Sequence, residues 1–213
     1  PEVITVDLCE ENAAGNRTAI SRRLAAELQK NLEAGEQSIL LMNRRGYHTF
    51  VACRSCGHVV TCPNCSISLT YHRANGRLMC HYCGYSQSIA DECPTCHSHS
   101  LRYAGMGTQR AEASLAQLLP QARILRLDAD ATMSKYAHER LLGQFSKGEY
   151  DIMIGTQMVA KGLDFPNVTL VGVLNADQML SGDDFRSYER AFSLLTQVVG
   201  RSGRGGYSGR AVI

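Results

Sequence analysis

Four Cys-x-x-Cys pairs constrain this chain more than any other feature of its sequence. All of them lie within residues 53–96, and they hold eight of the nine cysteines. The pairs are Cys53/Cys56, Cys62/Cys65, Cys80/Cys83 and Cys93/Cys96. A two-residue gap lets both thiolates of one tight turn reach the same tetrahedral zinc, with Zn–S bonds of about 2.3 Å. The pattern therefore predicts two structural zinc ions, each closed by four thiolates.

The lengths between the pairs indicate how they combine. Five residues separate the first pair from the second, and fourteen separate the second from the third. Fourteen is close to the roughly 15–20 residues that separate the pairs of a zinc ribbon. We therefore expect a nested arrangement, in which the two inner pairs share one ion and the two outer pairs share the other. Sequential pairing is the alternative.

Other uses of the cysteines fit less well. A disulfide framework is typical of secreted proteins, and the sequence shows neither a signal peptide nor an apolar run of membrane length. Thiolates also bind iron–sulfur clusters, but the ribbon-like spacer favours zinc. Histidines near the pairs are alternative ligands, although four thiolates already complete each site. These histidines are His58, His72, His81, His97 and His99.

Composition gives no bulk-charge argument for a nucleic-acid partner. The formal net charge of the 213 residues is +2 with the thiols counted as neutral. Eight zinc-bound thiolates and two Zn²⁺ add −4, which makes the formal total −2. A nucleic-acid surface must therefore be local. Cysteine use and the absence of targeting signals predict a cytoplasmic protein with no membrane segment.

Hydrophobic periodicity outside the cysteine block predicts alternating strands and helices. Strands are expected over 3–8, 38–42, 124–127, 152–154 and 168–174, and helices over 18–34, 108–119, 134–147 and 184–199. Continuously apolar strands that alternate with helices are typical of a parallel α/β sheet. We expect one α/β lobe from residues 1–50 and 105–213, and a zinc-binding insertion over 51–104.

Two polar stretches should lie beyond the carboxyl ends of these strands, where open parallel sheets bind their ligands. In 155–166, the backbone amides and hydroxyl of Gly155 and Thr156 suit a phosphate, and Asp164 suits a ribose hydroxyl. In 197–205, Arg201 and Arg204 suit a triphosphate. Taken singly, the first stretch also fits a glycine-rich turn and the second a solvated basic turn.

Together these stretches resemble a known family. The pattern Gly-Thr-Gln-Met…Lys-Gly-x-Asp-Phe-Pro, a strand, and then Gln-x-x-Gly-Arg-x-Gly-Arg resembles motifs V and VI of superfamily 2 helicases. The four cysteine pairs after residues 43–47, and residues 184–190 before the last motif, narrow the resemblance to the primosomal replication-restart helicases, the PriA family.

This resemblance implies a RecA-like second lobe of an ATP-dependent 3′–5′ DNA helicase that recognises stalled forks and D-loops and starts primosome assembly. It implies that Arg201, Arg204 and Gln197 act at the ATP γ-phosphate, and that Gly162 and Asp164 contact the nucleotide. Further implied DNA contacts are Thr156, Arg44 and Arg45. The implied partners are single-stranded and forked DNA, primosomal proteins and single-stranded-DNA-binding protein.

Neither a Gly-x-x-x-x-Gly-Lys-Ser/Thr phosphate loop nor an Asp-Glu-x-His box occurs in the sequence. Both belong to the first RecA-like lobe of a helicase. We therefore expect this piece to supply arginines but not the ATP phosphate cradle or the Mg²⁺ site, and to be inactive alone. The competing hypothesis is a non-catalytic zinc module that binds DNA or protein.

Overall fold

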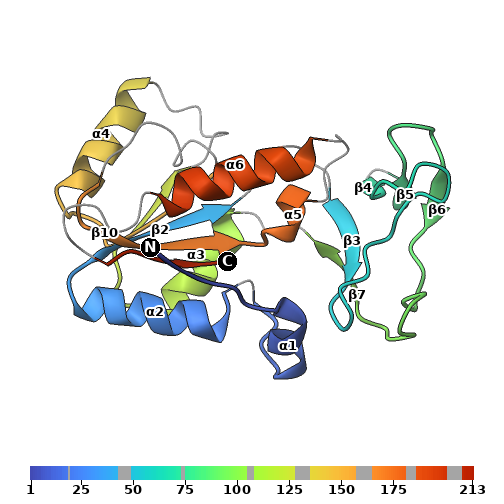
Figure 1. The fold of residues 1–213 in the computed structure, drawn as a ribbon, viewed down its shortest axis with the longest axis horizontal. Helices are drawn as coiled ribbons and strands as arrows, with labels where there is room; N and C mark the ends of the chain where they lie inside the picture. Colours follow the sequence, from blue (N-terminus) through green and yellow to red (C-terminus); the bar gives the residue numbers. More distant parts are fainter. Residues whose placement is uncertain are drawn as a thin grey trace.

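The computed structural model describes residues 1–18, 20–42, 49–72, 75–104, 108–127, 135–156, 165–180, 186–200 and 208–213. Within them the chain forms two sheets that lie side by side (Figure 1). The larger is a six-stranded parallel sheet, and the smaller is a five-stranded antiparallel sheet that contains the cysteine pairs.

The larger sheet has the strand order β1-β11-β10-β2-β9-β8. Its strands are β1 (Glu2–Ile4), β2 (Gln37–Met42), β8 (Ile124–Leu127), β9 (Ile152–Gly155), β10 (Val168–Leu174) and β11 (Arg210–Val212). Every pairing is parallel, as the apolar runs predicted. The helices are α1 (Leu8–Ala13), α2 (Arg22–Glu33), α3 (Thr108–Leu118), α4 (Lys135–Ser146), α5 (Asp177–Leu180) and α6 (Ser187–Val199).

Strand β2 shows why both faces of this sheet are buried. Its side chains alternate between two cores: Ile39 and Leu41 pack in one, and Leu40 and Met42 in the other. The first core receives side chains of α4 and α6, and the second receives side chains of α2 and α3. In Figure 1 these two helix pairs lie on opposite faces of the sheet.

The expected strand over 3–8 is only partly correct. Strand β1 ends at Ile4, and Leu8 already begins α1. The cause is Asp7, whose side-chain oxygen accepts a hydrogen bond from the backbone N–H of Cys9 at 2.7 Å and so caps the helix. The short helix α5 was not expected either. Outside these two places the predicted elements agree with the observed ones to within a few residues.

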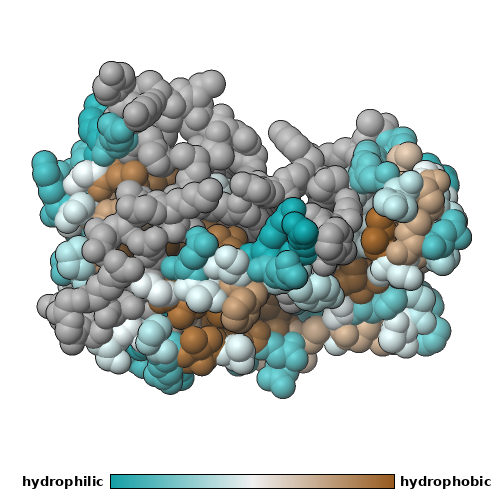
Figure 2. Space-filling model, turned by 45° about the horizontal axis from the view of Figure 1, so that its top comes forward, coloured by the Kyte–Doolittle hydropathy of each residue, from teal (hydrophilic) through white to brown (hydrophobic). Residues whose placement is uncertain are grey.

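The smaller sheet has the strand order β6-β5-β4-β3-β7. Its strands are β3 (Thr49–Cys53), β4 (Thr70–His72), β5 (Arg77–Met79), β6 (Ser86–Ser88) and β7 (Leu101–Ala104). They enclose a separate small core with Val51, Leu69, Leu78 and Leu101. Figure 2 shows hydrophobic residues reaching the surface at this end of the molecule, on the right of the view. So small a unit cannot bury much apolar surface and depends on cross-links for stability.

The described helices include none with the length and apolar character needed to cross a membrane.

Candidate metal centres

The structure gathers the eight paired cysteines into two groups of four. In each group the sulfurs all lie within 4.8 Å of one another. The groups are Cys53/Cys56/Cys93/Cys96 and Cys62/Cys65/Cys80/Cys83. The grouping is thus the nested one that the spacings favoured.

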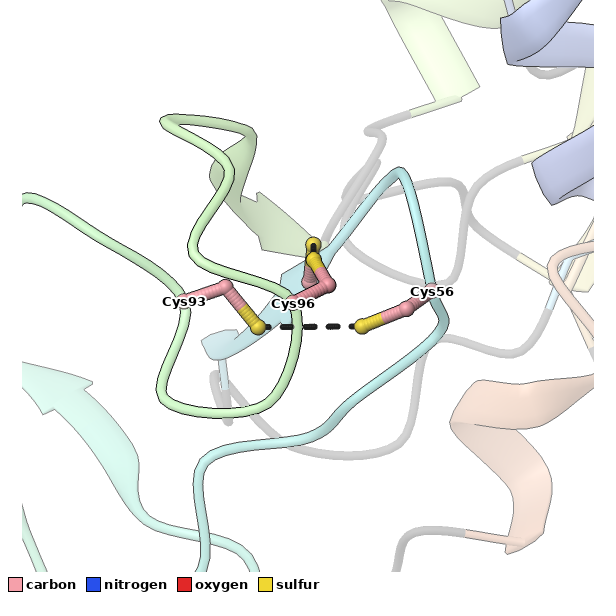
Figure 3. A group of neighbouring side chains, drawn as sticks. Cys56, Cys93 and Cys96 are labelled. Atoms are coloured by element: carbon pink, nitrogen blue, oxygen red, sulfur yellow. Dashed lines mark hydrogen bonds between the residues drawn. The ribbon is translucent and has the colours of Figure 1, made fainter.

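The sulfur–sulfur distances suit a tetrahedral ion rather than disulfides. Cys53 and Cys96 are 3.6 Å apart at Sγ, and Cys56 and Cys93 are 3.7 Å apart. The edge of a tetrahedron with Zn–S bonds of about 2.3 Å is about 3.8 Å. Figure 3 shows the Cys56 and Cys93 sulfurs facing each other from two separate turns of the chain.

All four turns share one backbone geometry. In each, the N–H of the residue after the second cysteine donates to the carbonyl of the first cysteine, at 2.9 to 3.0 Å. The first cysteine's N–H donates to the carbonyl five residues later, at 2.7 to 2.9 Å. The residue after the second cysteine has a positive φ in every turn. These residues are Gly57, Ser66, Gly84 and His97, with φ of 75°, 56°, 76° and 56°. This repeat was not predicted from the sequence, although the glycines at the first and third of these positions are a signal of it.

Hydrogen-bonding groups lie beside the sulfurs of the first group. The Ser98 hydroxyl lies 3.2 Å from the sulfurs of both Cys53 and Cys96. Burial alone raises the pKa of Cys53, but hydrogen bonds from Ser98 and from nearby backbone N–H groups outweigh it and lower that pKa to about 6. This environment favours the thiolate, which is the form that binds metal. Ser98 was not among the predicted site residues.

The second group behaves in the same way. A hydrogen bond from the backbone N–H of Tyr85 lowers the pKa of Cys83 to about 6. Burial, together with the neighbouring Cys83 and Cys80, raises the pKa of Cys65 to about 12. Thiolates crowded this closely repel one another, so one ionises readily only at the expense of its neighbour. A divalent cation removes that conflict, and thiolates with this spacing fit Zn²⁺.

Each group lies at the edge of the small core. Cys53 and Cys93 of the first group are buried, and so are Cys62 and Cys80 of the second. Their partners Cys56, Cys83 and Cys96 are exposed, and Cys65 is half-buried. Each turn therefore supplies one buried cysteine and one more exposed cysteine, and one ion at each site would tie two turns together and be closed to a fifth ligand or water.

Within the part of the chain that the structure describes, neither four-cysteine group includes a histidine. His72 and His81 instead contact each other, with their Nε2 atoms 3.2 Å apart. His99 lies beside Glu92, with Nε2 3.7 Å from a carboxylate oxygen. Among the described residues, both groups therefore consist of cysteine sulfurs alone.

The structure describes two of the predicted nucleotide and DNA residues. Thr156 directly follows β9 and is buried, at 4% exposure. Gln197 lies on the exposed face of α6, where its side-chain amide donates to Ser193 Oγ at 3.4 Å. The remaining predicted positions lie outside the described residues: Arg44, Arg45, Gly162, Asp164, Arg201 and Arg204.

Two of the described strands that precede these positions are neighbours in the large sheet. Strands β2 and β9 are neighbours and parallel, with Leu41 opposite Gly155 near their carboxyl ends. The chain that carries Arg44 and Arg45 follows β2, and the chain that carries Gly162 and Asp164 follows β9. The carboxyl ends of β2 and β9 therefore lie together, at the edge where open parallel sheets bind their ligands.

Two family models match parts of this chain. Residues 62–87 match the family model of the PriA DNA helicase Cys-rich region, and residues 101–206 match the helicase conserved C-terminal domain. The replication restart protein PriA of Bacillus subtilis is 53% identical over all of this chain, and that of Synechocystis is 47% identical over all of it. The chain belongs to the PriA family. It spans about a quarter of these relatives, 26% in each case.

Membership of the PriA family gives the large sheet its identity. It is a RecA-like helicase C-terminal lobe, with two four-cysteine zinc groups in the accompanying small sheet. Among solved structures, the C-terminal domain of the DEAD-box protein Dbp5 aligns with 99% of this chain and 74% of its own at a TM-score of 0.45 and 13% identity.

Proposed function

We propose that this chain is the second RecA-like lobe, with its zinc-binding insertion, of an ATP-dependent 3′–5′ DNA helicase that restarts stalled replication forks. The observation that carries the proposal is the 53% identity to a replication restart protein along the entire chain. We place the lobe in residues 1–50 and 105–213 and the insertion in 51–104. The two sheets support this division, because they draw on different parts of the chain.

In this proposal the lobe contributes positive charge to ATP held against a first RecA-like lobe. Arg201 and Arg204 neutralise charge at the γ-phosphate as hydrolysis proceeds, and Gln197 orients the polar groups beside them. Gly162 and Asp164 contact the nucleotide from the neighbouring strand end. ATP and Mg²⁺ need the phosphate loop of the other lobe, so the isolated chain is expected to hydrolyse no ATP.

The same edge of the sheet is proposed to follow the DNA backbone. Arg44 and Arg45 have the charge, and Thr156 the hydroxyl, that phosphate contacts use. The zinc insertion is proposed to bind forked or single-stranded DNA, primosomal proteins and single-stranded-DNA-binding protein. A protein with this role works in the cytoplasm, beside the chromosome.

The two zinc ions are proposed to be structural. The eight predicted ligands are the cysteines of the two groups, and their sulfur geometry and burial support that role. Since four thiolates fill a tetrahedral ion, no position is left to activate water.

Fork-stimulated ATP turnover by the full-length protein tests the proposal. Arg204→Ala should lower turnover by about 10³-fold or more, as loss of an arginine finger does, while DNA affinity holds. Arg140→Ala, which removes an exposed arginine of α4, is the control and should leave turnover unchanged. If the wild-type protein shows no ATP turnover, or if Arg204→Ala leaves turnover unchanged, the lobe is a non-catalytic scaffold.

The second candidate is a zinc module that only binds DNA or protein. The exposed aromatic ring of Tyr82, at 85% exposure in the Cys80–Cys83 turn, favours a binding role for the insertion. Both roles are compatible within one longer protein, and the Arg204→Ala result distinguishes a module alone from a helicase that contains one.

A further inference from the structure

A basic pocket lies where the start of the large lobe meets the small sheet. It has a volume of about 100 Å³, and its lining residues are Asn12, Arg17, Arg54, Ser100 and Arg102. Asn12 belongs to α1, and Arg17 to the loop that follows it. The other three belong to the cysteine-rich unit. We name this site the arginine pocket.

Strand register explains why three of these side chains meet. On β3 and β7, Ala52 is opposite Arg102 and Cys53 is opposite Leu101. The pairing continues past the strand end, where the backbone N–H of Arg54 donates to the carbonyl of Ser100 at 3.0 Å. Residues two apart on a strand share a face, so Ser100 and Arg102 stand on the same side of the sheet.

Arg54 joins the two parts of the pocket. Its Nη1 donates to the backbone carbonyl of Arg17 at 3.1 Å. The loop that carries Arg17 is itself held by Glu11, which accepts hydrogen bonds from the side chain of Asn16 at 2.7 Å and the backbone of Arg22 at 2.9 Å. The site is therefore built from two anchored segments rather than from one surface turn.

The pocket holds three positive charges without a carboxylate to balance them. Across the described parts of the chain, no guanidinium of Arg17, Arg54 or Arg102 forms an ion pair, although other arginines do. Arg102 Nη1 donates only to backbone carbonyls, those of Leu101 at 2.8 Å and His99 at 3.3 Å. Each guanidinium has five N–H donors, so most of them remain available to an anion.

We propose that the arginine pocket binds a backbone phosphate of a DNA strand. Guanidinium groups recognise phosphate by paired N–H donors, and the Asn12 amide and Ser100 hydroxyl add neutral donors of the kind found at phosphate contacts. The proposal rests on the proposed DNA function and adds a second place of contact, outside the helicase motifs and at the junction with the small sheet.

A strand suits this site better than a free phosphate ion. All three arginines are exposed, and salt screens their attraction for a small ion at about 0.15 M ionic strength. DNA carries condensed counterions, and their release on binding favours contact even at an exposed arginine. The contact carries no base readout, so it should be independent of sequence.

The test is DNA binding by the zinc-loaded full-length protein, followed by fluorescence anisotropy with a single-stranded oligonucleotide at several salt concentrations. The variant is R17Q/R102Q, which leaves Arg54 and its bond to the Arg17 carbonyl in place. Arg54 is kept because it follows Cys53 directly, where its charge also offsets the formal −2 of a zinc tetrathiolate. We expect affinity to fall about tenfold, and the slope of log Kobs against log salt to fall in magnitude by about 1 or more, equally for different base sequences.

The matched control is R140Q/K147Q, which removes the same charge from two exposed residues, one on α4 and one directly after it. It should keep the wild-type slope, and all variants should keep two zinc ions per chain. Unchanged affinity and slope in R17Q/R102Q, or an equal loss in the control, would overturn the pocket proposal alone. A wild-type protein that does not bind DNA would overturn both it and the proposed function. Inorganic phosphate is tested in the same way. If R17Q/R102Q weakens the binding of inorganic phosphate but not the binding of DNA, the ligand of the pocket is not a DNA strand.

Discussion

The sulfur of Cys53 lies 3.6 Å from the sulfur of Cys96, although 43 positions separate the two residues in the chain. An ion at this site closes the small sheet from its first strand to the turn before its last. The cysteines of the second group lie within that loop in the sequence, so both ions would stabilise the same small core.

Loss of one zinc ligand should unfold the small sheet and spare the large one. Cys80 is buried at 2% exposure, so Cys80→Ser removes both a ligand and part of the core. Structural zinc contributes on the order of 10 kcal/mol to folding. We expect bound zinc to fall from two ions per chain to one or none, with most of the helical circular dichroism retained, since the described long helices belong to the large lobe.

Cys9→Ser is the matched control for this experiment. Cys9 is the one cysteine outside the two groups, and the variant should retain both ions. Collapse of the helical signal in Cys80→Ser would show that the two sheets fold as one unit, contrary to this prediction.

Ser66→Gly should stabilise the second zinc group. Ser66 has φ of 56°, a left-handed conformation that costs an L-residue roughly 1–2 kcal/mol, whereas glycine adopts it freely. After the entropy that glycine loses, a net gain of up to about 1 kcal/mol is expected. The measurement is the chelator concentration that releases half of the zinc, which should rise.

Gly84→Ala tests the same cause in the opposite direction. Gly84 is the equivalent residue of another turn, with φ of 76°, and a Cβ built there meets no atom within 4 Å. Any loss of zinc retention therefore comes from the backbone and not from a clash. If neither Ser66→Gly nor Gly84→Ala changes zinc retention, backbone strain in the turns does not limit zinc retention.

Replacement of Glu27 should lower the free energy of unfolding. Its side chain on α2 is only 2% exposed, and it contacts Arg210 of β11 at 2.5 Å, Arg23 at 3.1 Å and Lys30 at 3.2 Å. Glu27→Ala removes the nearer of the two carboxylates that contact the Arg210 guanidinium and leaves only Glu36, at 3.9 Å. Breaking a buried ion pair from one side costs about 3–5 kcal/mol, which urea unfolding measures.

Arg23→Ala is the control for Glu27. It removes a partner that is 51% exposed, and surface pairs contribute about 0–1 kcal/mol. If the two variants lower the free energy of unfolding equally, the burial of Glu27 does not increase its contribution to stability.

Glu11 should make stability depend on pH in the acid range. The backbone N–H of Arg22 and the side-chain amide of Asn16 hold the pKa of Glu11 below its ordinary value, which is about 4.3 in model peptides. A pKa lowered in the folded state means that the stabilisation is present above that ordinary value and is lost as pH falls through the lower folded value. Unfolding free energy measured between about pH 6 and 3 should therefore decline less steeply in Glu11→Gln than in wild type. Parallel curves for the two proteins would contradict this role.

The zinc ligands could be predicted from the sequence because the geometry of each Cys-x-x-Cys turn is local. Two cysteines in one tight turn reach one ion whatever the rest of the chain does, and the fourteen-residue spacer by itself favours the nested grouping. The parallel sheet was equally accessible. The strand Val168–Leu174 is apolar at nearly every position, which only a strand buried on both faces requires.

Tertiary structure decided what depends on contacts between distant segments. Leu8 reads as the end of a strand, yet the Asp7 side chain makes it the start of a helix. Nothing in the sequence near Ser98 marks its hydroxyl as a hydrogen-bond partner of both Cys53 and Cys96, because it reaches Cys53 only after the chain has folded back across 45 positions. The arginine pocket has the same origin: Arg17, Arg54 and Arg102 are far apart in sequence, and only the pairing of β3 with β7 and the docking of the loop after α1 bring their charges together. Local patterns thus determine elements and ligand pairs, whereas shared sites form only where long-range packing brings separate segments into contact.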